Sequence, residues 1–340
     1  MMKRKKVLQA FILTVVVLLV LSQSQAIAGA IPHRSFELTY EVHLDSIPSD
    51  ARELRVWIPM ATNDRHQQIR QRLIHSPVSY QVTKDPEYGN DILYLDLRTP
   101  IPPTLDLAVL YEADVHGEQV ELAKASSVPS GLGRKMQFDL QSNRYMVVND
   151  EVRALAQAVA AGAPTPAEKV ERIYRYVIER MTYEKETPGW GNGDTVRACS
   201  VGTGNCTDFH SLFISLARAC GIPARFQIGL PVPNKAEGEI PGYHCWAFVY
   251  LPKMGWVPVD ASEAWKDRKR IGYFLGTYDP NRFALSTGRD IQLLPKPASG
   301  RVNIFFAPYV EIDGKSIDKS QIKTKFRFRD VGIVQGVNHA

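Results

Sequence analysis

The N-terminal third of the chain alternates between apolar and polar positions. In the stretch "SFELTYEVHLDSI" the apolar side chains share one side of an extended strand: Phe36, Leu38, Tyr40, Val42 and Leu44. The stretches "RELRVWIPM", "ILYLDL" and "LDLAVLYEADVHG" are also strand-like, and proline and Gly/Asn/Asp clusters separate them. This pattern predicts a small, all-β, sandwich-like domain over residues 31–130.

Helical spacing begins near residue 145. The stretch "NDEVRALAQAVAAG" starts with a capping residue and ends at Gly162, and "PTPAEKVERIYRYVIERM" has Pro166 near its first turn. One apolar stripe follows that proline: Val170, Ile173, Tyr174, Val177 and Ile178. After residue 242 the chain returns to strand patterns, as in "HCWAFVYL" and "GWVPVDAS". Helices followed by strands predict an α+β domain over residues 145–340.

A third helix is predicted in "GNCTDFHSLFISLARACGIPARF", residues 204–226. Its apolar residues recur with helical spacing, and Gly221 and Pro223 end it. Cys206 therefore falls in the first turn, where free N–H groups and the helix dipole lower the pKa of a thiol and can bind an oxyanion. Cys220 falls on the apolar face at the far end, which predicts a packing role.

A reactive thiolate requires a nearby base, and His244 is the best-placed histidine. It begins the strand "HCWAFVYL", and a tight turn leads to the next strand, which ends in Asp260. An antiparallel hairpin would bring imidazole and carboxylate side by side, so that Asp260 orients the ring. His210 lies four residues after Cys206, but its ring is expected to point along the helix and not over the sulfur.

These motifs and their order resemble the transglutaminase-like superfamily, a branch of the papain-like thiol enzymes. The resemblance covers about residues 145–310. It implies a core in which the helix with the cysteine packs on an antiparallel sheet with the histidine and aspartate. By this resemblance Cys206 is the nucleophile, His244 the base and Asp260 the orienting residue.

Other residues are assigned less directly. The resemblance implies a second oxyanion donor upstream of the helix, for which Trp190 and Tyr183 are candidates, and Trp246 is a candidate groove wall or core residue. Many relatives have a small residue where this chain has Cys245. Either Cys199 or Cys245 could form a disulfide with the nucleophile under oxidation.

Charge and the remaining motifs exclude several other classes. The formal charge of +5 comes largely from four basic residues at positions 3–6, and the rest of the chain is nearly neutral, which gives no support for nucleic-acid binding. Close cysteine pairs typical of structural zinc sites are absent from the sequence, so no metal is expected. No nucleotide or dinucleotide motif occurs in a fitting context, so no cofactor is expected.

The first 28 residues have the features of a signal peptide. A basic start is followed by an apolar run from about Val7 to Leu21 and then by small residues. An uncleaved anchor helix is the alternative, but the run is short for a membrane span. No later segment is long and apolar enough to cross a membrane, so a periplasmic or secreted protein is expected.

The sequence as a whole predicts an exported cysteine-dependent enzyme that acts on amide bonds of a protein or peptide substrate. Hydrolysis is favoured over cross-linking, although the sequence does not determine whether water or an amine accepts the acyl group. The alternative is a non-catalytic envelope binding or scaffold protein that retains the fold. The oligomeric state stays open.

Overall fold

A computed structural model of the chain describes residues 32–122 and 133–331. The predicted signal peptide, residues 1–28, lies outside this part of the chain. Within it, no helix has both the length and the apolar character needed to cross a membrane.

The predicted sandwich consists of two five-stranded antiparallel sheets. The first has the order β11 (Glu237–Glu239), β18 (Ile322–Asp330), β1 (His33–Leu44), β6 (Leu105–His116) and β3 (Gln67–His75). The second has the order β17 (Lys315–Ser316), β16 (Tyr309–Ile312), β2 (Glu53–Met60), β5 (Asp91–Arg98) and β4 (Gln81–Lys84). The alternation in β1 reflects burial of one side of the strand, as predicted, because its five apolar side chains all lie in one core.

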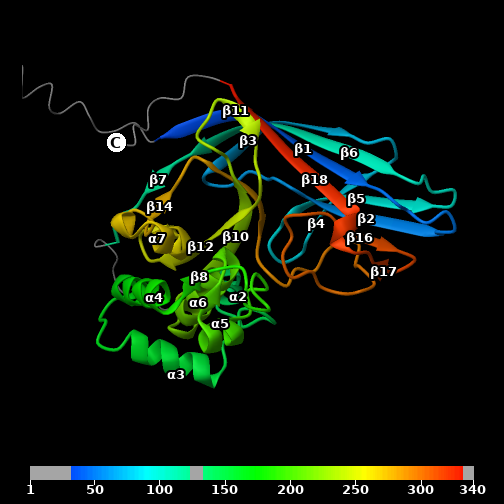
Figure 1. Cartoon of the computed structure of the whole chain (residues 1–340). Coiled ribbons are helices and arrows are strands. Elements are labelled where there is room, and N and C mark those ends of the chain that lie inside the picture. Colours follow the sequence, from blue (N-terminus) through cyan, green and yellow to red (C-terminus); the bar gives the residue numbers. More distant parts are fainter. Residues whose placement is uncertain (1–31, 123–132, 332–340) are drawn as a thin grey trace, which may run out of the picture. The chain divides into compact units, whose positions relative to one another are not determined.

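Strands from the far end of the chain complete both sheets. β18 pairs with β1 along its length, and β16 pairs with β2. Figure 1 shows red β18 lying beside blue β1. The sandwich predicted for residues 31–130 therefore includes strands from residues 309–330, which the sequence had placed with the catalytic half. The division of the chain into folding units at residues 130 and 145 stays a prediction.

The helical core packs on a four-stranded antiparallel sheet. Its order is β13 (Gly255–Val259), β12 (His244–Leu251), β10 (Ala224–Pro231) and β15 (Arg282–Thr287). The helices are α2 (Arg134–Phe138), α3 (Asp150–Val159), α4 (Pro166–Arg180), α5 (Thr195–Val201), α6 (Cys206–Ala219) and α7 (Ala261–Lys266). Two short pairs complete the pattern: β7 (Glu118–Gln119) with β14 (Thr277–Tyr278), and β8 (Thr182–Tyr183) with β9 (Thr203–Gly204). The α+β fold class is thus confirmed.

Local sequence explains where the helices begin. The Asn149 side chain caps α3 by accepting from the Val152 amide, and Thr165 caps α4 with Pro166 at its first position. All five residues of the stripe predicted for α4 are buried. These two helices pack against each other and against α6.

The four-stranded sheet is covered on both faces. Alternate residues of β10 and β12, such as Phe226 and Ala247, pack with the helices, whereas Trp246 and Phe248 join the core of the sandwich. A sheet buried on both sides can hold polar side chains in fixed positions at its ends, and β12 begins with His244.

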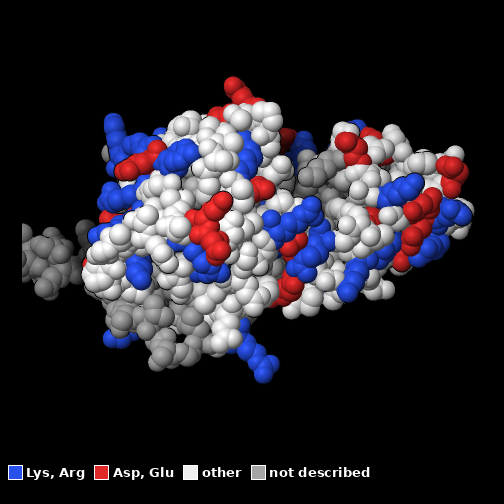
Figure 2. Space-filling view, turned by 90° about the horizontal axis from the view of Figure 1, so that it is seen from below, with Lys and Arg blue, Asp and Glu red and all other residues white. Residues whose placement is uncertain are grey.

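The outer surface carries both signs of charge. Figure 2 shows Lys and Arg interspersed with Asp and Glu over the face that is drawn. Several exposed charges of the protein pair across neighbouring strands, as in Arg329 with Glu37, 2.7 Å apart, and Arg327 with Glu41. A mixed surface of this kind fits the near-neutral charge of the chain after its basic start.

Candidate active site

The start of α6 is fixed by a reciprocal capping arrangement. The Asn205 side chain accepts a hydrogen bond of 2.8 Å from the Thr207 amide, and the Asp208 carboxylate accepts one of 2.9 Å from the Asn205 amide. Cys206 is the first residue of the helix and so lies in the predicted first turn, and the helix ends before Gly221, which has φ of +78°. Asn205 is buried, which leaves no room for a glycan at the formal sequon "NCT".

Asp208 also holds the loop that precedes α5. Its carboxylate accepts from the amides of Gly191 at 2.7 Å and Gly193 at 3.0 Å. The buried Arg289 binds the same loop, donating to the Gly193 carbonyl at 3.2 Å and to Ser211 of α6 at 2.5 Å. A Cβ at residue 193 would collide with the Arg289 side chain, so the close approach requires glycine. The loop around the helix start is therefore rigidly positioned.

The structure brings Cys206, His244 and Asp260 together. β12 and β13 form the expected antiparallel hairpin, with Ala247 opposite Val259. Nε2 of His244 lies 2.6 Å from Oδ2 of Asp260, and the imidazole also forms a hydrogen bond with Cys206. The exposed fractions are 2% for Cys206, 7% for His244 and 0% for Asp260. Because Nε2 faces the carboxylate, Nδ1 is the nitrogen left for the thiol.

The electrostatic surroundings of Cys206, His244 and Asp260 favour a thiolate beside an imidazolium. Hydrogen bonds from Cys245 and then from His244 hold the pKa of Cys206 well below its usual value, although burial opposes them. Burial alone would lower the pKa of His244, but the charge of Asp260 and the contact with Cys206 raise it to about 10. Burial likewise opposes ionisation of Asp260, yet His244 and Arg282 hold its pKa well below the usual range.

Asp260 is held by more groups than the sequence indicated. It caps α7, because its Oδ1 accepts from the Glu263 amide and from the Ser262 hydroxyl, each at 3.0 Å. Arg282, the first residue of β15, donates to Oδ2 at 2.6 Å, so this oxygen binds both the imidazole and the guanidinium. Sequence reasoning missed Arg282 because strand pairing, and no motif, places β15 near Asp260.

His210 belongs to the site in a supporting position. Its ring is fully buried, and Nε2 accepts a hydrogen bond of 3.2 Å from the Ala261 amide and lies 3.5 Å from Oδ1 of Asp260. Nδ1 then carries the ring proton and lies 3.6 Å from the Cys245 sulfur. The expectation that His210 does not lie over the nucleophile agrees with these contacts, but its packing against Asp260 was not foreseen.

The three aromatic candidates occupy different places. Tyr183 packs near Phe209 of α6, and burial followed by the charge of Cys206 raises its pKa to about 12. Trp190 is 38% exposed, with its ring near the Lys185 ammonium. Trp246 is fully buried and donates from its indole nitrogen to Gln227 at 2.8 Å. Tyr183 is therefore the candidate whose surroundings bear on Cys206, and Trp246 has a core position.

All four cysteines are free thiols. Cys199 lies on α5, and Cys220 is the C-cap of α6, half-buried, with its sulfur 3.7 Å from the Ala156 carbonyl. The predicted packing role of Cys220 is thus a position at the margin of the core and not within it. Over residues 32–122 and 133–331 no group of three His, Cys, Asp or Glu side chains is arranged to hold a metal ion.

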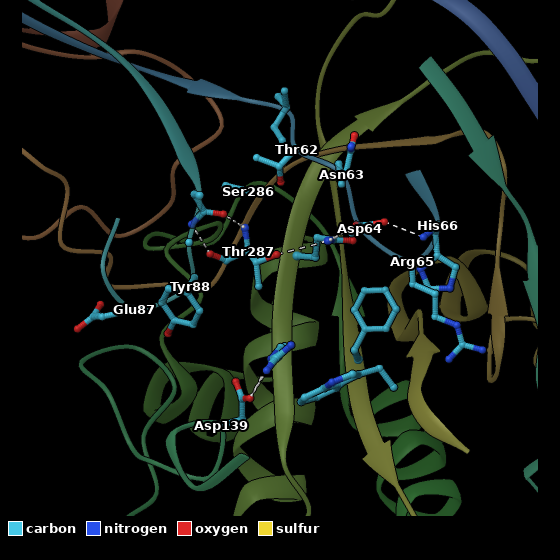
Figure 3. A pocket seen from close by; sticks show the side chains of 18 of the residues that line it. Thr62, Asn63, Asp64, Arg65, His66, Glu87, Tyr88, Asp139, Ser286 and Thr287 are labelled. Atoms are coloured by element: carbon cyan, nitrogen blue, oxygen red, sulfur yellow. Dashed lines mark hydrogen bonds and ion pairs between the residues drawn. The ribbon is translucent and has the colours of Figure 1, made fainter. Parts of the chain in front are cut away.

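A cavity of about 350 Å³ lies on the other face of the four-stranded sheet. Figure 3 shows Thr62 to His66, Tyr88 and Asp139 around it. Its polar side chains are largely satisfied by one another: Gln227 donates to Asp64 at 3.2 Å, and Arg225 donates to Asp139 at 2.6 Å. None of the three predicted catalytic residues lines it. The cavity therefore marks the junction of sheet and sandwich loops, separate from Cys206.

The chain is similar to several known proteins. Residues 153–261 match the transglutaminase-like superfamily, and this range contains all three predicted catalytic residues. An uncharacterized protein of Haemophilus influenzae is 26% identical over 317 residues, which cover 80% of this chain and 85% of that protein.

A similar fold occurs in a solved structure. A candidate cysteine protease from Cytophaga hutchinsonii superposes with a TM-score of 0.62 at 15% identity, covering 88% of this chain and 92% of that one. The periplasmic domain of TgpA from Pseudomonas aeruginosa gives a TM-score of 0.37 at 19% identity, covering 69% of this chain and 93% of that domain.

Proposed function

Residues 153–261 match the transglutaminase-like superfamily, and we propose that the chain is a cysteine-dependent acyl-transfer enzyme with Cys206 as nucleophile, His244 as base and Asp260 as orienting residue. One observation carries the proposal. A buried line of hydrogen bonds joins the three side chains, and the pKa of the thiol is lowered while that of the imidazole is raised. This is the arrangement that an activated thiolate requires.

The first half of the reaction forms a thioester. The Cys206 thiolate attacks an amide carbonyl, and the imidazolium of His244 gives its proton to the leaving amine. Asp260 keeps the ring fixed through Nε2, so that Nδ1 faces the reacting atoms. In the second half His244 removes a proton from the acceptor, and the thiolate leaves.

The oxyanion of the intermediate requires hydrogen-bond donors beside Cys206. The Cys206 amide lies at the N-terminus of α6, whereas the Thr207 amide is already bonded to the cap. We assign the second donor to the Tyr183 hydroxyl. Its ring packs against Phe209 of α6, with 6.0 Å between the ring centroids, and burial followed by the charge of Cys206 raises its pKa to about 12, so the neutral hydroxyl is available as a donor.

The proposed substrate is a protein or peptide amide, with hydrolysis favoured over amine transfer. Export to the periplasm or the exterior is part of the proposal and rests on the character of residues 1–28. In such a compartment, water is the acceptor present at the highest concentration. An amine acceptor would need a binding site beside Cys206 that orders it ahead of water.

Trapping of the acyl-enzyme tests the proposal. Purified protein is mixed with a peptide library, quenched in acid and digested, and the peptide that contains Cys206 is examined by mass spectrometry. The expected result is an acyl group on Cys206 in the wild type and in Cys199→Ser, and none in Cys206→Ala. Slow labelling of Cys206 by iodoacetamide at pH 7, at the rate of free cysteine, together with no acyl-enzyme, would instead indicate a scaffold protein.

A further inference from the structure

A second thiol touches the proposed nucleophile. Cys245 follows His244 on β12, and its side chain faces α6. The Cys245 sulfur lies 3.9 Å from the Thr207 hydroxyl and 3.6 Å from Nδ1 of His210, and it shares a hydrogen bond with the Cys206 sulfur. Both cysteines are buried in the same core, on elements that pack directly against each other.

We propose that Cys206 and Cys245 are a modification site, at which a peroxide oxidises Cys206 and Cys245 then closes a reversible disulfide. The two other cysteines do not compete for this step. Cys199 lies on α5, next to the Arg180 side chain, and Cys220 lies at the opposite end of α6. Among the three other cysteines, all within the residues that the structure describes, Cys245 is the one that shares a hydrogen bond with the nucleophile.

The chemistry proceeds in two balanced steps. The Cys206 thiolate attacks one oxygen of the peroxide, the O–O bond breaks, and Cys206 becomes a sulfenic acid while hydroxide or alkoxide leaves. The Cys245 sulfur then attacks the Cys206 sulfur, so that an S–S bond forms and the S–O bond breaks. The hydroxide that leaves takes the proton of Cys245 and departs as water. A dithiol reductant reverses the change.

The surroundings of Cys245 explain why it reacts second. Burial and the adjacent Cys206 thiolate raise the pKa of Cys245 well above its usual value, so it stays a neutral thiol while Cys206 is reduced. A sulfenic acid at Cys206 carries no such charge, and that obstacle to ionisation of Cys245 disappears. The Nδ1–H group of His210 then donates to the developing thiolate.

The disulfide would inactivate the nucleophile and also protect it from further oxidation. Without a resolving thiol, a sulfenic acid reacts with further peroxide to a sulfinic acid, which thiol reductants do not reverse. This proposal concerns the two thiols alone and requires no substrate. Its failure can therefore be distinguished from failure of the acyl-transfer proposal.

The test is disulfide mapping after controlled oxidation. Reduced full-length protein is treated with increasing hydrogen peroxide, quenched with an alkylating agent in denaturant, and digested. The expected result in the wild type is loss of two thiols, a linked Cys206–Cys245 peptide pair, and full recovery of both thiols with dithiothreitol. Cys199→Ser is the matched control and should give the same linked pair.

Two variants sharpen the result. In Cys245→Ser, which replaces sulfur by a hydroxyl beside Thr207 and His210, Cys206 should oxidise irreversibly to sulfinic acid. In Cys206→Ser, Cys245 should resist the same peroxide dose. Sulfinic acid on Cys206 in the wild type, without the linked pair, would overturn the proposal, as would a link from Cys206 to Cys199 or Cys220. The wild-type mapping decides the question even if a variant fails to fold.

Discussion

The two ends of α6 each carry a cysteine, and the two thiols differ in almost every property. Cys206, at the first residue, is hydrogen-bonded to another thiol and to an imidazole, and its pKa is held well below the usual value. Cys220, at the C-cap, is half-buried beside the Ala156 carbonyl, and burial raises its pKa. One helix therefore holds a thiolate at one end and an ordinary thiol at the other.

The comparison shows how much of this difference comes from outside the helix. The dipole favours a negative charge at the N-terminus and disfavours it at the C-terminus, but it is worth only about 0.3–1 kcal/mol at a helix end. The stronger contributions at Cys206 come from Cys245 and His244, both on β12, and from Asp260 behind the imidazole. A cysteine at a helix start becomes a nucleophile only where other elements supply these groups.

The largest expected effect follows removal of the sulfur at the N-terminal end. Cys206→Ala should lower the turnover of any amide substrate by at least about 1,000-fold, because the thiolate beside His244 is lost. The loss of one buried sulfur should cost about 1 kcal/mol of folding free energy, so the variant stays folded. Steady-state kinetics and thermal melting check both statements. Residual turnover near that of the wild type would assign the chemistry to another residue.

The second effect concerns the pH range over which the site at the Cys206 end of α6 is active. Because the pKa of His244 is raised to about 10, activity should fall on the alkaline side as pH rises through that value and the imidazolium is lost. Asp260→Asn removes the anion that supports the imidazolium, so the alkaline limb should move to lower pH while turnover falls about 100-fold or more. The measurement is kcat/KM against pH. An unmoved alkaline limb in Asp260→Asn would show that the carboxylate does not act on His244.

Substitution of Arg282, which binds the same oxygen of Asp260 as His244, should shift the alkaline limb in the opposite direction. Arg282→Met removes a cation that repels the imidazolium, so the alkaline limb should move to higher pH, while loosened positioning lowers kcat/KM about tenfold. Arg282→Lys keeps the positive charge and is the matched control, with a limb close to that of the wild type. Equal shifts in both variants would mean that Arg282 acts by packing alone.

The smallest effect is expected at the C-terminal end. Cys220→Ser should leave kcat/KM unchanged and lower the free energy of unfolding by less than about 1 kcal/mol, since the side chain is half-buried and a hydroxyl can also donate to the Ala156 carbonyl. Activity assays and denaturant melts measure the two quantities. A large loss of activity would show that the two ends of α6 are coupled.

Local signals predicted the elements that hold the candidate site. The apolar spacing and the glycine stop of α6 place Cys206 in its first turn, and the short turn before Gly255 makes the hairpin that aligns His244 with Asp260. Both features depend on residues close together in the chain. The same holds for the stripe of α4 and the alternation of β1.

Features that depend on long-range pairing were not predictable in this way. The β16 and β18 strands pair with β2 and β1, and nothing in their local pattern indicates which strand they pair with. Arg282 reaches Asp260 only because β15 pairs with β10, and His210 reaches it only because α6 packs against α7. Both contacts join residues that are far apart in the chain, so no local pattern indicates them.

The most direct test of the central claim is the rate of alkylation of Cys206 and Cys220 by iodoacetamide as a function of pH, with each site read by mass spectrometry in one sample. Cys220 serves as the internal reference on the same helix. Cys206 is expected to react rapidly at neutral pH, with a midpoint well below the value of about 8.5 for free cysteine, and the midpoint for Cys220 is expected above that value. Coincident curves for the two thiols, both near the midpoint of free cysteine, would contradict the claim that Cys206, His244 and Asp260 form a coupled site.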